Sequence, residues 1–211
     1  SGELGNQQGN IIDNDAVEAV LEFHQQLWVD ELVPRQNFVE DGAQWGHDHR
    51  SGEVAFFPSA YGIAVSEAEE EFRPLSQNVL LPGPAGGNAL FSGGDNLCIL
   101  NGAPNPSGAW QFMRYTLELE MQRAMPDTGY MPIRSDSADA EFTESYEQAA
   151  VPVANLDEGF VPSTLSYNLL YNQQAGPWLA MIRRAVFDRD VPGAMAEAQS
   201  EYDRILIQAQ L

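Results

Sequence analysis

The chain has 211 residues, enough for one large domain or two small lobes, and 44% of them are hydrophobic, so it is able to build a packed core. It carries 31 acidic and 10 basic residues, for a formal net charge of -21, and every basic residue is an arginine. A field of this sign repels nucleic acids and anionic membrane surfaces, so the sequence excludes both as partners.

The first predicted helix begins after Asn14, whose side chain is a suitable N-cap, and ends before Pro34. Its apolar residues recur at helical spacing from Val17 to Leu32. His24 shares that face, and we expect it to be a core histidine rather than a ligand.

Three stretches of the middle region are predicted to contain strands. Residues 53–65, "EVAFFPSAYGIAV", indicate a buried strand that bends at Pro58 and runs into a short helix near Tyr61. Residues 78–88, "NVLLPGPAGGN", indicate a strand followed by a Pro/Gly turn, and this turn is the best linker candidate. Residues 89–103 form the third stretch, in which the single cysteine, Cys98, is expected to be a small buried hydrophobe.

The second half is predicted to be mainly helical. Asn105 and Pro106 provide a cap and a first helical residue, further helices are expected over 140–151 and 176–187, and Pro192 opens the last one. Between them, "PVANLDEGFVPS" (152–163) is predicted to be a second extended linker.

Catalytic signatures are missing from the sequence. It has no G-x-S-x-G, H-E-x-x-H, P-loop or G-x-G-x-x-G motif, and no lysine to form a Schiff base. We therefore expect no enzyme, no metal and no cofactor, although glycoside hydrolysis by a pair of carboxylates stays open. His47 and His49 would face one side of an extended segment, but no third ligand accompanies them, so a solvated loop is the preferred interpretation.

Aromatic residues beside polar turns are the strongest sign of a binding site. Flat rings suit the apolar faces of sugars, and Asp, Asn and Arg side chains suit their hydroxyls. Each ring could equally be core or surface packing. The aromatic residues in or near predicted loops are Trp45, Tyr61, Tyr130, Tyr167, Tyr171 and Trp178.

Four stretches occur in an order that resembles a known family. They are "DNDAVEAVLEFHQQLWVDELVP", "RSGEVAFFPSAYGIAV", "NVLLPGPAGGNALFSGGDNLCILNGAPNPSGAWQFMRYTL" and "TGYMPIRSD". This order is similar to the C-terminal part of the extracellular solute-binding proteins of ABC sugar importers, the group that includes maltose-binding protein. The resemblance covers nearly the whole chain.

The resemblance implies an α/β, periplasmic-binding-protein-like two-lobe fold of type II, with the ligand held in the cleft between the lobes. Residues 1–88 and 160–211 would belong to the C-terminal lobe, and residues 93–152 to the N-terminal lobe. Residues 89–92 and 153–159 would be the crossover or hinge segments.

The turn "SGGDN" then falls where the chain enters the other lobe. Glycine there would let the backbone approach a ligand, and Asp95 and Asn96 would offer side chains to sugar hydroxyls, unless they only cap the turn. Tyr61 stands about where the family's sugar-stacking aromatic lies. The predicted substrate-binding residues are Trp45, Tyr61, Gly94, Asp95, Asn96, Tyr130, Arg134 and Tyr171.

The function implied is capture of a sugar or oligosaccharide and its delivery to ABC permease subunits, in the periplasm or on the extracellular face of the bacterial membrane. The alternatives are a glycan-processing enzyme, or a binding protein for another solute such as a polyamine or peptide. Because family members are about twice as long, we expect this chain to be a C-terminal fragment. Its partner would be the missing N-terminal half of the same protein, which would carry a lipid anchor, or a second fragment in a dimer.

Overall fold

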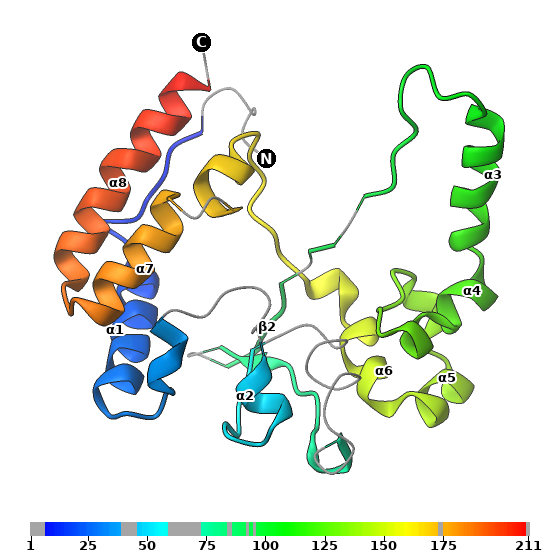
Figure 1. Cartoon of the computed structure of the whole chain (residues 1–211), viewed down its shortest axis with the longest axis horizontal. Coiled ribbons are helices and arrows are strands. Elements are labelled where there is room, and N and C mark those ends of the chain that lie inside the picture. The colour runs from blue at the N-terminus through cyan, green and yellow to red at the C-terminus, as the bar shows by residue number, and fades with distance from the viewer. Residues whose placement is uncertain are drawn as a thin grey trace. The chain divides into compact units, whose positions relative to one another are not determined.

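The computed structural model describes residues 7–38, 46–58, 73–83, 86–91, 93–94, 96–172 and 175–209. The chain divides into two compact units, which we describe separately. Unit 1 comprises Ser1–Asp41 and Pro162–Leu211, and unit 2 comprises Gly42–Val161 (Figure 1). The assignment of residues 1–88, 93–152 and 160–211 to the two lobes of a binding protein stays a prediction.

Unit 1 is helical in its described part. Its elements are α1 (Asp15–Val29), the 3-10 helix η1 (Arg35–Phe38), the π-helix η7 (Asn168–Asn172), α7 (Pro177–Phe187) and α8 (Val191–Gln208). The predicted cap of α1 is confirmed, because the Asn14 side chain accepts a hydrogen bond from the Val17 amide at 3.2 Å. Asp190 caps α8 in the same way, from the Gly193 amide at 2.9 Å.

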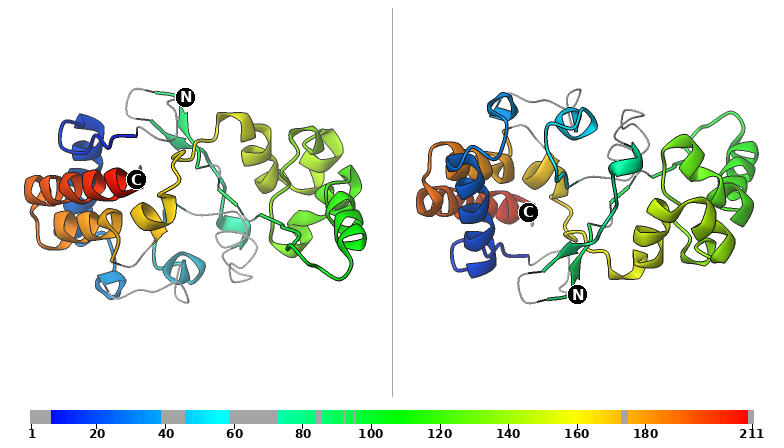
Figure 2. Two further views of the ribbon diagram at one scale, coloured as in Figure 1. Left: turned by 90° about the horizontal axis from the view of Figure 1, so that it is seen from above. Right: turned by 90° about the horizontal axis from the view of Figure 1, so that it is seen from below.

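The core of unit 1 lies where α1 packs on α7 and α7 packs on α8 (Figure 2). Burial of each large apolar side chain there contributes about 1.5–3 kcal/mol to stability. The buried members of this core are Ile11, Leu21, Leu170, Met181, Ala185, Val191, Ala194, Met195, Ala198, Tyr202, Ile205 and Leu206.

The start of the described chain is tied to α8 by one amide side chain. Gln199 accepts hydrogen bonds from the amides of Ile11 (2.8 Å) and Ile12 (3.3 Å), and its Nε2 donates to the Gly9 carbonyl at 3.0 Å. These bonds satisfy backbone groups that have no helix or strand partner, so the segment that leads into α1 is held against the last helix.

Aromatic rings close the other end of unit 1. The Phe187 ring packs edge-on against Trp28 and Phe38, with centroids 4.7 and 4.9 Å away. The guanidinium of Arg35 lies 4.2 Å above the Trp28 ring, and that of Arg183 lies 4.8 Å above Phe38. These cation–π contacts fix η1 to α1 and α7.

Unit 2 consists of short elements. They are α2 (His47–Arg50), η3 (Arg73–Leu75), β1 (Leu81–Pro82), β2 (Asn88–Ala89), α3 (Pro106–Thr116), α4 (Leu119–Arg123), η4 (Met125–Thr128), η5 (Ser135–Ser137), α5 (Ala140–Ser145), α6 (Glu147–Ala154) and η6 (Leu156–Glu158). The predicted start of α3 is confirmed, since Asn105 accepts from the Gly108 amide at 3.0 Å.

A small core joins α5 and α6 in unit 2. Its buried residues are Phe142, Ala149, Ala150 and Val153. Asn78 is pinned to α6 as well, because its Nδ2 donates to the Gln148 carbonyl at 3.0 Å. By contrast, α3 buries none of its residues.

The predicted strands are largely wrong within the described residues. The sheet found there has two strands, with β1 antiparallel to β2 and Leu81 opposite Ala89. Residues 53–58 and 96–100 form no strand, so the described part of the chain is mostly helical, with little of the expected α/β sheet. Strand formation needs a partner, and the apolar pattern alone does not supply one.

The second linker is also not extended as predicted. Residues 153–154 belong to α6, with Pro152 inside that helix, and 156–158 form η6. Val153 is fully buried in the small core, which explains why the segment stays helical. Just beyond it, Phe160 forms a parallel bridge with Phe91, and its amide donates to the Leu90 carbonyl at 2.9 Å.

Two predicted core residues are exposed. His24 lies on the solvent side of α1, with Nδ1 2.8 Å from the Val20 carbonyl. Cys98 is exposed too, because the segment around it has no covering layer among the described residues. None of the described helices is long and apolar enough to cross a membrane.

Candidate ligand-binding residues

The structure describes five of the eight predicted binding residues. Trp45, Tyr61 and Asp95 lie outside the described residues. The other five are divided between the units: Gly94, Asn96, Tyr130 and Arg134 belong to unit 2, and Tyr171 belongs to unit 1.

Gly94 and Asn96 lie in an open, exposed part of the chain that has no regular secondary structure. A Cβ at Gly94 would meet no described atom within 4 Å, whereas a Cβ at Gly93 would collide with the ring of Phe91. Gly93 therefore allows the Phe91 ring to fold against the backbone, and Gly94 leaves the backbone accessible. This openness is what a ligand-approach role needs, and that role stays a prediction.

Tyr130 stands on the surface, with 65% of the residue exposed. It follows Gly129, whose φ of 82° turns the chain out of η4, and its amide donates to the Met125 carbonyl at 3.2 Å. The backbone below the ring is therefore fixed while the ring faces solvent. An exposed ring on an ordered turn is able to stack on a sugar.

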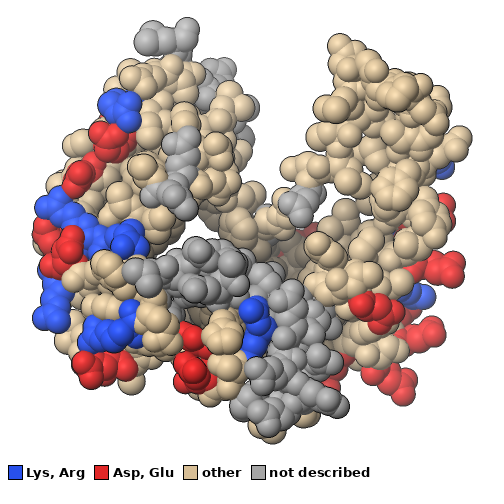
Figure 3. Space-filling view, viewed as in Figure 1, with Lys and Arg blue, Asp and Glu red and all other residues tan. Residues whose placement is uncertain are grey.

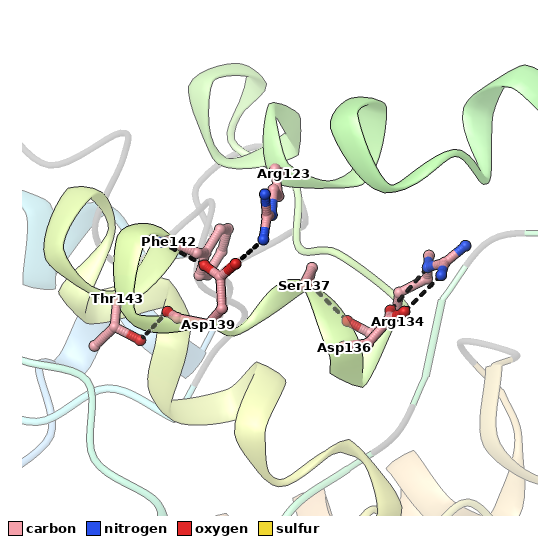
Figure 4. A network of polar contacts seen from close by, with 7 residues as sticks. All are labelled: Arg123, Arg134, Asp136, Ser137, Asp139, Phe142 and Thr143. Atoms are coloured by element: carbon pink, nitrogen blue, oxygen red, sulfur yellow. Dashed lines mark hydrogen bonds and ion pairs between the residues drawn. The ribbon is translucent and has the colours of Figure 1, made fainter.

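Arg134 is held by its neighbours. Its Nε and Nη2 donate to the two carboxylate oxygens of Asp136 at 2.8 and 2.6 Å (Figure 4). Its Nη1 donates to the Leu117 carbonyl at 3.0 Å. The hydrogen bonds from Arg134 hold the pKa of Asp136 below the ordinary range of an aspartate. All three guanidinium nitrogens are thus engaged in local hydrogen bonds, so the role that the structure shows for Arg134 is to stabilise this loop.

Gln122 fixes the same loop from beneath, and the sequence alone did not single it out. Its side chain is buried, donates to the Thr116 carbonyl at 2.6 Å and accepts from the Ile133 amide at 2.8 Å. The sequence signal that could have identified Gln122 is a polar residue on the inner face of the short helix α4. The end of this turn at Ile133 and Arg134 is consequently held by the bond from the Ile133 amide to Gln122 and by the ion pair between Arg134 and Asp136.

Asp139 links this loop to the small core of unit 2. Its carboxylate pairs with Arg123 and accepts from the Phe142 amide at 3.0 Å, so it both caps α5 and ties it to α4 (Figure 4). An Asp directly before an amphipathic stretch is the usual N-cap signal, and it could have been recognised in the sequence.

Tyr171 is half-buried among other rings. Its ring centroid lies 5.0 Å from Tyr167, 5.7 Å from Trp178 and 6.0 Å from Tyr202. Tyr202 is buried at the base of this group, and burial raises the pKa of its phenol. Three of the aromatic residues that the sequence marked as loop rings therefore form one cluster that packs on the helical core.

A groove of about 370 Å³ lies in unit 1 beside α7 and α8. Its lining includes small apolar residues such as Ala180 and Ala198 and charged residues such as Arg184 and Glu197. Arg184 is engaged by Asp190, 2.6 Å away, and by Glu197. None of the five described binding residues lines the groove.

No group of three His, Cys, Asp or Glu side chains that could hold a metal ion occurs among the described residues. His47 and His49 lie in the short helix α2, where residues two apart point about 200° apart around the axis. The two imidazoles therefore do not face the same side, as they would in an extended segment. The predicted solvated loop is wrong as well, because the segment is helical.

Residues 2–151 match the family of bacterial extracellular solute-binding proteins. The match covers well over half of the chain, so the chain belongs to this family. No curated protein matches the sequence. Proteins of this family bind a small-molecule solute for a transporter outside the cytoplasm, and they are typically not enzymes.

Proposed function

We propose that this protein captures a sugar or oligosaccharide and delivers it to the permease subunits of an ABC importer. The observation that carries the proposal is family membership over residues 2–151. The choice of a sugar is supported by the exposed ring of Tyr130 on an ordered turn, with the open backbone at Gly94 in the same unit.

The proposal includes two lobes that close on the ligand, with residues 89–92 and 153–159 as the crossings between them. Pairing of Phe91 with Phe160 supports this, because it places residue 91 of one crossing beside the residue that directly follows the other crossing. A ligand that contacts both lobes would stabilise the closed form only by the difference in its affinity for the two forms.

A polyamine is the second candidate solute, since a chain with a net charge of -21 attracts cations. The aromatic residues favour a carbohydrate instead. Three parts of the proposal rest on the resemblance to solute-binding proteins of ABC sugar importers: maltose-like specificity, a lipid anchor and a type II arrangement of the lobes.

Isothermal titration against a panel of mono- and oligosaccharides, with spermidine as the alternative ligand, tests the proposal. For a sugar that binds, Tyr130→Ala should weaken affinity about fivefold, because stacking on a ring is worth about 1 kcal/mol. Tyr115→Ala is the matched control: it removes another exposed ring of unit 2 and should leave affinity unchanged.

Three results would count against the sugar. Binding of spermidine and of no sugar would show that the solute is a polyamine. Equal losses of affinity in both variants would show that Tyr130 is not a specific ligand contact. Release of sugar products during the titration would show that the protein is an enzyme.

A further inference from the structure

The sequence contains a single Asn-Gly dipeptide, Asn101–Gly102. It lies in unit 2, in the turn that precedes α3. An amide nitrogen that follows an asparagine is least hindered when it belongs to glycine, because glycine has no side chain. The Cγ carbon of Asn101 is therefore close in the chain to an unhindered nitrogen with which it is able to react.

The turn around this dipeptide is a type II β-turn. The Ala103 amide donates to the Leu100 carbonyl at 3.1 Å, and Gly102 has a φ of 83° at the second central position. Asn101 is not among the described non-glycine residues with positive φ, which distinguishes the turn from type I′. The amide between Asn101 and Gly102 is the central one of the turn, so the hydrogen bond that closes the turn leaves it free.

The two reacting groups are accessible. Asn101 and Gly102 are both exposed, and a Cβ at Gly102 would meet no described atom within 4 Å. Within the described part of the chain, no hydrogen bond engages the Asn101 carboxamide or the Gly102 amide. Asn105 differs, because its side chain accepts from the Gly108 amide at 3.0 Å and a proline follows it.

Charged side chains are missing from the sequence around the turn. Residues 96–113 contain no Asp, Glu, Lys, Arg or His. In Figure 3 the top of the part of unit 2 that holds α3, at the upper right, is tan. A neighbour in this stretch therefore offers no ionic group that would hold the Asn101 carboxamide away from the backbone.

We propose that Asn101 is a site of spontaneous deamidation. The Gly102 nitrogen attacks Cγ of Asn101, a C–N bond closes a succinimide ring, and the side-chain nitrogen leaves as ammonia with the proton of the Gly102 amide. Water then opens the ring at either carbonyl, which gives aspartate or isoaspartate. The attack is intramolecular, so it needs no partner other than water.

Both products change the turn. Each adds one carboxylate to a stretch that has none, and isoaspartate also adds the Cβ carbon of Asn101 to the main chain. The longer main chain no longer fits a four-residue turn, so the bond from the Ala103 amide to the Leu100 carbonyl should be lost.

Incubation of the folded protein in mildly alkaline buffer tests the proposal, with peptide mass spectrometry to locate deamidation and isoaspartate methyltransferase to label the product. Asn96 is the internal control: it is exposed in the same part of the chain but is followed by Leu97. Asn101 should convert at least about tenfold faster, because the leucine side chain hinders attack by its amide. Hydrogen exchange of the Ala103 amide should become faster in the isoaspartate product.

Two matched variants separate the sites. Asn101→Gln lengthens the side chain and disfavours ring closure, so it should remove the methyltransferase label, whereas Asn96→Gln should leave the label unchanged. Equal conversion at Asn101 and Asn96 overturns the proposal, as does a label that survives Asn101→Gln. Conversion that occurs only in urea would show that the folded turn keeps the two atoms apart, and that result also overturns it.

Discussion

The two units bury their apolar side chains to very different extents. In the described part of the chain, the core of unit 1 contains twelve buried residues and that of unit 2 contains four. Helix α8 alone buries seven residues, whereas α3, whose sequence is at least as amphipathic, buries none. An apolar stripe therefore becomes a core only where a second element covers it.

Substitution of Phe142 would break unit 2 selectively. Phe142 is the largest side chain of a four-residue core, so Phe142→Ala should reduce the free energy of unfolding of unit 2 by about 3–5 kcal/mol. Hydrogen exchange should show α5 and α6 opening while α7 and α8 stay protected. Phe112→Ala, at an exposed position of the same unit, is the control, and a comparable loss there would contradict the core assignment.

In unit 1, two adjacent leucines allow a sharper comparison. Leu170 is 2% exposed and Leu169 is 45% exposed, and both lie in η7. Leu170→Ala should cost about 2–5 kcal/mol in urea unfolding because it leaves a cavity, and Leu169→Ala should cost less than about 1 kcal/mol. Similar values for the two would mean that η7 does not pack on the core in solution.

Replacement of Gln122 tests the buried bridge of unit 2. Gln122→Met keeps the length of the side chain and leaves the Ile133 amide and the Thr116 carbonyl without their partner. Unfolding should become easier by about 2 kcal/mol, and the Ile133 amide should exchange faster. Gln111→Met, on the exposed side of α3, should change neither quantity.

The smallest expected effect concerns the acid stability of unit 1. Hydrogen bonds from Arg184, and then from the Gly193 amide, lower the pKa of Asp190 in the folded protein. A lowered folded pKa contributes stability above the ordinary aspartate value of about 3.9, and this contribution is lost as the pH falls through the folded pKa.

Asp190→Asn retains the cap but loses the charge, so its unfolding free energy should fall less steeply below about pH 4 than that of the original protein. Chemical unfolding at a series of acidic pH values measures the slopes. Identical slopes would show that Asp190 does not contribute.

Local signals in the sequence predicted the helices well. Asn14, Asn105 with Pro106, and Pro192 lie where helices begin, because a cap depends on residues within one turn. His24 was misplaced because the buried line of α1 follows Leu21 and Trp28, and at 100° per residue His24 lies about 60° from Leu21 and about 40° from Trp28, at the edge of that line.

Sheet and site were harder to predict because both depend on distant residues. The strand expected around Cys98 has no partner among the described residues, and no local pattern reveals that. Tyr130 and Tyr171 have the same sequence signature, an aromatic beside a turn, yet one is exposed and the other packs against Trp178 and Tyr202. What separates them is the presence of α7 and α8 beside Tyr171.

The attachment of α1 to α7 and α8 has a consequence for synthesis. Residues 42–161 are made between these partners, so α1 emerges from the ribosome long before the surfaces that cover Leu21 and Trp28 exist. At ordinary rates of translation the delay is roughly ten to forty seconds. Until then α1 is a single amphipathic helix of marginal stability, and such an unfinished chain is open to chaperones and to threading through a translocation pore.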